Sequence, residues 1–157
     1  MEKFKEFRNL MEEYDALLDK LSKVENSKVQ AISHDRIEEL EALMRSEEAE
    51  ILRMRGLDGR RKKLLDESGY SGMTFSQVVD SLEGEEHEIS KALCMRMKEK
   101  TESLRGLSGS TANMIEAKLI TIDELIARNN LTEGVGYGRD GTVAKGKNVS
   151  RIGSLSV

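Results

Sequence analysis

Apolar residues recur at steps of three and four along most of this 157-residue chain, which contains no proline and no tryptophan. This spacing places apolar side chains on one stripe of an α-helix. Aromatic residues make up only 4% of the chain, against 34% charged residues. Because a compact globule usually packs aromatic bulk into its core, we expect these apolar residues to form seams between long helices.

The spacing predicts a first helix over about 2–31 and a second over about 35–67, with Ser33 as the N-cap that separates them. Glu47 occupies a position of the second stripe where an apolar residue is expected. Two glycines, Gly56 and Gly59, lie inside the second helix, where each costs roughly 1 kcal/mol relative to alanine. They mark a kink, a close helix crossing or a local break, and the pattern does not choose between these.

A turn cluster at 68–72 ends the second helix. Thr74 and Gln77 then match a capping box, which predicts a short helix over 75–82. A long helix over about 85–130 follows, and the glycines at 106 and 109 weaken its middle enough for it to be two helices end to end.

Past residue 131 the composition changes. Residues 132–157 hold six of the thirteen glycines, and four cationic against two acidic side chains give a formal charge of +2. Such a segment is too poor in apolar area to pack a core. The predicted fold is therefore all-α: an elongated antiparallel helical bundle of three long helices and one short helix (1–131), with a flexible C-terminal tail (132–157).

Charge and cysteine content exclude several classes of function. A net charge of −4 argues against a nucleic-acid binder, which would be basic. Cys94 is the single cysteine, so no internal disulfide or thiolate metal cluster can form. The start of the chain is charged, and no run approaches the roughly 18 apolar residues of a membrane span. We expect a cytoplasmic protein without membrane insertion.

Two motifs resemble sites that carry chemistry, but both lack the structural context that the chemistry needs. Residues 141–148 (GTVAKGKN) nearly spell a phosphate-binding loop, but no strand precedes them, and Asn148 replaces the magnesium-binding hydroxyl. His87 lies in an acidic helix start without a second histidine at helical spacing. No Ser/His/Asp or Cys/His set has supporting context. We therefore expect no catalytic residue, no cofactor, no metal site and no enzymatic activity.

The most basic stretch lies in the second helix. Acidic residues surround it, which favours a solvated helix face over a surface for phosphate or an acidic partner. Its members are Arg53, Arg55, Arg60, Arg61, Lys62 and Lys63.

The last long helix carries an apolar face wider than a two-position seam requires. The face is either bundle core or a surface that takes another protein's amphipathic helix. Its members are Met114, Ile115, Leu119, Ile120, Ile122, Leu125 and Ile126.

Three segments resemble the FlgN family of flagellar export chaperones, in the same order along the chain. Residues 10–18 (LMEEYDALL) are similar to the family's leading helix, and residues 37–48 (IEELEALMRSEE) resemble its second helix. The segment from Asn129 through Tyr137 to Gly141 resembles the family's terminal asparagine followed by tyrosine and glycine.

The resemblance implies a function. Family members bind hook–filament junction (hook-associated) proteins in the cytoplasm, prevent their early association, and deliver them to the export gate of the flagellar type III apparatus. By position, the implied client contacts are Met114, Ile115, Leu119, Ile122, Leu125 and Ile126. Tyr137 matches the tail tyrosine and is the implied contact with the export gate.

One rival interpretation comes from another class. In it, the chain is a structural coiled-coil protein, and its apolar face is a seam for self-association, for example in a homodimer. Light scattering separates the two, since a stable oligomer without client affinity supports the rival.

Overall fold

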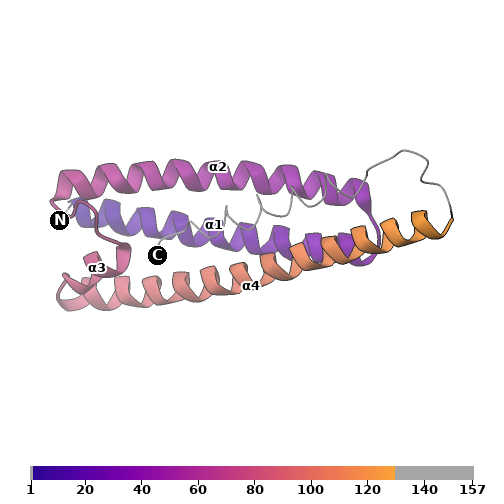
Figure 1. Ribbon diagram of the computed structural model, residues 1–157. Helices are drawn as coiled ribbons and strands as arrows, with labels where there is room; N and C mark the ends of the chain where they lie inside the picture. Colours follow the sequence, from indigo (N-terminus) through magenta and orange to yellow (C-terminus); the bar gives the residue numbers. More distant parts are fainter. Residues whose placement is uncertain (1, 130–157) are drawn as a thin grey trace.

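The computed structural model describes residues 2–129, which form four α-helices (Figure 1). No strand occurs among these residues, so the predicted all-α fold of three long helices and one short helix is confirmed. The predicted tail, 132–157, lies outside the described residues. The helices are α1 (Glu2–Ser33), α2 (Ile37–Ser68), α3 (Phe75–Asp80) and α4 (Gly84–Arg128).

The central helix of the bundle is α1, which packs against both α2 and α4 (Figure 1). Ion pairs join α1 to α4, and the residue numbers of the two partners increase together from one pair to the next. They include Arg8–Glu86 and Asp15–Arg96, and the pair Asp35–Lys118, from the turn that follows α1, continues the same order. The helices α1 and α4 are therefore parallel, and α2, which follows α1 after a short turn, is antiparallel to both.

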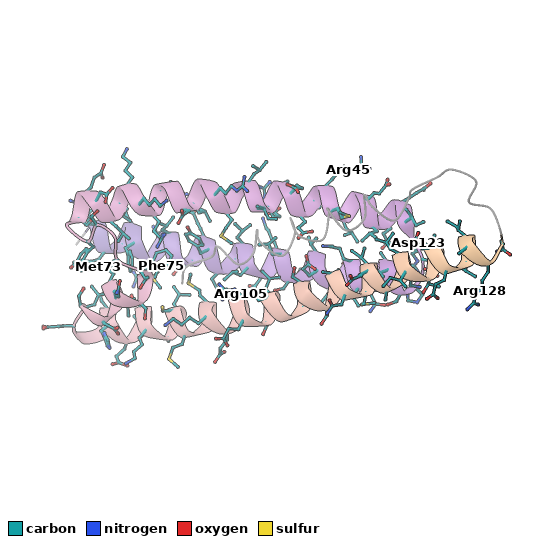
Figure 2. All side chains as sticks on the ribbon, in the orientation of Figure 1. Arg45, Met73, Phe75, Arg105, Asp123 and Arg128 are labelled. Atoms are coloured by element: carbon teal, nitrogen blue, oxygen red, sulfur yellow. The ribbon has the colours of Figure 1, made fainter. Side chains whose placement is uncertain are left out.

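The contiguous apolar core fills the half of the bundle in which the chain starts, and α3 closes it. Phe75 is 1% exposed, and its ring lies edge-on to those of Phe7 and Tyr14, with centroids 5.4 Å and 5.2 Å away. The guanidinium of Arg61 on α2 lies 5.6 Å from the centre of the same ring. One side chain of α3 thus contacts two long helices (Figure 2).

The capping box predicted for α3 is confirmed. Thr74 Oγ1 accepts a hydrogen bond from the Gln77 backbone N–H at 3.2 Å, and Gln77 Oε1 accepts one from the Thr74 N–H at 2.9 Å. These two bonds satisfy backbone donors at the helix start that would otherwise lack partners. They fix the entry to α3 and so the position of Phe75.

A layer of buried charged side chains ends this core partway along the bundle. Glu25, Lys28 and Glu47 are 0%, 2% and 4% exposed. Lys28 Nζ donates to Glu25 Oε1 at 3.0 Å and to Glu47 Oε2 at 2.7 Å. The second oxygen of Glu25, Oε2, has no hydrogen-bond partner among the described residues. Glu47 thus takes the apolar position noted in the sequence because Lys28 supplies its counter-charge.

Burial raises the pKa of Glu47, against the lowering effect of its hydrogen bond from Lys28. The folded state therefore holds this proton more tightly than the unfolded chain does. It follows that the contribution of Glu47 to stability falls as pH rises from the ordinary glutamate pKa to the raised one.

Glu47→Gln removes this ionisation and should flatten the pH dependence. We expect the free energy of unfolding of the variant, relative to wild type, to increase as pH rises through the same window. Urea unfolding from pH 4 to pH 8 measures it, with Glu99→Gln on the exposed surface as the matched control. A difference that stays constant with pH contradicts the raised pKa.

The glycines inside α2 and α4 do not interrupt either helix. Both helices run continuously, and no heavy atom lies within 4 Å of the position that a Cβ would take at Gly56, Gly59, Gly106 or Gly109. Of the alternatives that the sequence left open, the structure therefore excludes a local break in α2, a close crossing within the described chain and a divided α4. Each glycine costs roughly 1 kcal/mol, and burial of neighbouring side chains offsets this cost.

The predicted N-cap role of Ser33 is also wrong. Ser33 ends α1, and its hydroxyl donates to the carbonyl of Val29 at 2.8 Å. Asp35, with a φ of 54°, makes the turn, and α2 begins after Arg36 without a side-chain cap. Aspartate tolerates this left-handed conformation because its short side chain can bond locally.

Candidate protein-binding surface

The C-terminal part of α4 extends past the end of the bundle (Figure 1). Lys118 Nζ donates to Asp35 Oδ1 at 2.8 Å, which places Lys118 beside the turn between α1 and α2. The following residues, 119–128, have no helix of the bundle beyond that turn to pack against. At 1.5 Å per residue this overhang is about 15 Å long.

The stripe of α4 that faces the core continues along the overhang. Residues 115, 119, 122 and 126 repeat the three- and four-residue steps of buried Leu104, Ser108 and Thr111. Ile122 and Leu125 are 48% and 51% exposed, and the other four predicted contact residues are half-buried. These four are Met114, Ile115, Leu119 and Ile126.

The structure thus brings the six predicted contact residues onto one end of one helix. Their exposure argues against the alternative that this face is entirely bundle core, since Ile122 and Leu125 lie beyond the layer that α1 could cover. Ile120, 53% exposed, points away from the stripe and does not share it. Binding of a client by these residues stays a prediction.

Polar groups hold the overhang helical and flank its apolar stripe. Asn129 Nδ2 donates to the carbonyl of Leu125 at 3.0 Å, which satisfies an acceptor at the end of the helix. Asp123 and Arg128 lie on the overhang, exposed (Figure 2). The overhang is therefore an amphipathic helix end with an unpaired apolar side.

The remaining candidates have structural roles. His87 Nδ1 lies 2.9 Å from the carbonyl of Val79 and links α4 to the end of α3. No group of three or more potential metal ligands occurs among residues 2–129. Cys94 belongs to the core, as predicted, and burial raises the pKa of its thiol. Tyr137 and residues 141–148 lie outside the described residues.

Much of the basic stretch of α2 is paired with acidic side chains, as the surrounding charges suggested. Arg60 binds Glu13 of α1 through two hydrogen bonds of 2.7 Å and 3.1 Å. Arg61 and Lys62 pair with Asp58. The charged layer around Lys28 was the feature that sequence analysis missed. The one available signal was Glu47 itself, a charged residue in an apolar position.

A helical bundle with an exposed apolar helix end is typical of proteins that bind other proteins through helices. Among residues 2–129, no helix combines the length and apolar character needed to cross a bilayer. The family model described as "FlgN protein" matches residues 1–145. The chain therefore belongs to the FlgN family, and its general role is that of a flagellar export chaperone. No curated protein and no solved structure matches the chain.

Proposed function

We propose that this protein is a cytoplasmic escort for hook–filament junction (hook-associated) proteins. It binds them before export, prevents their premature association and delivers them to the flagellar type III export gate, without an enzymatic step of its own. The observation that carries the proposal is the exposed apolar stripe of α4 beyond the bundle core.

The exposed apolar stripe of α4 is suited to covering an apolar surface of an export client. A junction subunit whose terminal helix exposes an apolar face is prone to aggregate. The overhang can cover such a face by helix-to-helix packing, as amphipathic helices do in hydrophobic grooves. Fully burying an aliphatic side chain stabilises a complex by about 1.5–3 kcal/mol. Ile122 and Leu125 are already about half covered, so burying the rest of both side chains contributes roughly 1.5–3 kcal/mol in total, which is about 10- to 150-fold in affinity. Such a complex can be released without ATP hydrolysis by the chaperone.

Contact with the export gate is assigned to Tyr137, which lies outside the described residues. The support for this assignment is the position of the tyrosine after the last helix, as in the FlgN resemblance. A Tyr137→Ala variant that keeps client affinity and loses export supports the assignment.

Charge replacements on the overhang test the binding site. We expect Ile122→Glu combined with Leu125→Glu to weaken the binding of purified junction proteins at least 100-fold, because two carboxylates then face the apolar side of the client. Isothermal titration calorimetry measures the affinity, and circular dichroism checks that helicity is kept.

Met95→Glu is the matched control. Met95 is 56% exposed on the same helix, within the bundle rather than on the overhang, so this variant should bind clients as wild type does. If the Ile122/Leu125 variant binds junction proteins with unchanged affinity, the assignment of the binding site to the overhang is wrong. A stable oligomer that binds no junction protein favours the structural coiled-coil alternative instead.

A further inference from the structure

The overhang exposes its apolar stripe next to the point at which the described part of the chain ends. Ile122 and Leu125 are 48% and 51% exposed, and Asn129 follows Leu125 by one helical turn. Asp123 and Glu124 lie between the two apolar residues, are exposed, and form no ion pair within residues 2–129. The overhang therefore presents apolar side chains beside negative charge that the described chain does not neutralise.

The sequence that follows combines the opposite charge with apolar side chains. Residues 142–157 contain three cationic residues and no acidic one, which gives a formal charge of +3. Arg151 is directly followed by Ile152, and Leu155 lies three positions further on. These are the two largest apolar side chains of the segment. The segment is therefore complementary to the overhang in charge, and it supplies aliphatic side chains for the stripe.

Reach along the chain selects the overhang among the apolar surfaces. A glycine-rich chain of 22 residues, the number that separates Asn129 from the apolar pair, has an r.m.s. length of about 26 Å. Ile122 lies about 10 Å back along the helix from Asn129. The apolar pocket beside Phe7 lies at the other end of the bundle (Figure 1), where Arg8 pairs with Glu86. Along α4 that is about 65 Å away.

We infer that residues 151–157 of this chain cover the apolar stripe of its own overhang in the free protein. Ile152 and Leu155 pack on Ile122 and Leu125, and the cation that precedes them faces the adjacent carboxylates. A linker of this kind gives the segment an effective concentration in roughly the millimolar range. A contact of about millimolar affinity is then formed in about half of the molecules, whatever the protein concentration.

The contact competes with any client that binds the same stripe, a consequence that rests on the proposed function. The apparent affinity for a client falls with the fraction of molecules whose stripe is open. If the contact closes about half to nine-tenths of the molecules, replacing Ile152 and Leu155 by glutamate should strengthen client binding about two- to tenfold. Isothermal titration calorimetry measures this gain. Unchanged client affinity in a variant that has lost the contact overturns the competition.

A spin label beside the segment tests the contact without any client, so its result is independent of the proposed function. Cys94→Ala removes the single cysteine, and Ser150→Cys carries the label on the full chain. We expect the backbone amide signals of residues 119–128 to lose roughly half of their intensity or more, while those near Phe7 keep theirs. Thermal unfolding shows that each variant is folded.

Matched variants separate a contact from the effect of the tether alone, which brings the label near the overhang in any case. Ile152→Glu combined with Leu155→Glu should restore most of the lost intensity, because two carboxylates then face an apolar stripe. Ser154→Glu combined with Ser156→Glu adds the same charge to the same segment and should leave most of the intensity loss in place.

Three results overturn the inference. An equal intensity loss in both pairs of variants shows that the tether alone brings the label to the overhang. A loss in a nitrogen-15 chain without a label, mixed with a labelled chain of natural isotopic abundance, assigns the contact to a second copy. A loss that persists at residues 119–128 in Ile122→Glu combined with Leu125→Glu shows that the segment does not bind the apolar stripe.

Discussion

Replacing Lys28 by methionine should lower the free energy of unfolding by about 3–5 kcal/mol at neutral pH, because it leaves a buried charge without its counter-charge. Lys28 contacts Glu25 at 3.0 Å and Glu47 at 2.7 Å, and the three side chains are at most 6% exposed. Without the ammonium, two carboxylates share one buried site. They must then take up protons or admit water, so the loss should shrink as pH falls and the carboxyls protonate.

Urea unfolding at several pH values measures this effect. Lys91→Met removes an exposed lysine from α4 and should change stability by no more than about 0.5 kcal/mol. Replacing Glu25, Lys28 and Glu47 together by leucine, methionine and leucine should recover most of the loss, since apolar side chains of similar volume need no counter-charge. A Lys28→Met variant as stable as wild type at neutral pH would show that the layer is not buried in solution.

Phe75→Ala should destabilise the bundle by a similar amount, about 3–5 kcal/mol, through lost burial and the cavity left behind. Its ring lies within 5.4 Å of Phe7, 5.2 Å of Tyr14 and 5.6 Å of Arg61. The six residues of α3 are too few to be helical alone, so packing of this side chain holds α3 in place. We expect α3 to detach in part and the core beneath it to loosen.

Thermal unfolding and hydrogen exchange measure this loss, with Phe4→Ala as the matched control. Phe4 is 39% exposed near the start of α1, so its truncation should cost clearly less. Client affinity provides a second readout, because α3 and the overhang lie at opposite ends of the bundle (Figure 1). A folded Phe75→Ala variant should bind clients as wild type does, and loss of affinity contradicts the placement of the site on the overhang.

Local interactions made much of the fold predictable. The three- and four-residue steps predicted each long helix to within a few residues, since a helix buries one stripe whatever it packs against. The capping box of Thr74 and Gln77 predicted the start of α3 because both hydrogen bonds lie within four residues. The same reasoning failed at Ser33, where a hydroxyl can bond backward to Val29 as readily as it can cap the next helix.

The sequence by itself determined the helices, their apolar stripes and the amphipathic character of the last one. Only the tertiary structure decided which parts of those stripes are covered. Lys28 is 19 residues from Glu47, so their pairing required α1 and α2 to pack antiparallel. Ile122 and Leu125 continue the stripe that Leu104 buries, and they are exposed because α4 runs parallel to a shorter α1 and extends beyond it. Helical periodicity reports a direction around an axis, whereas burial depends on which helix lies alongside and where that helix ends.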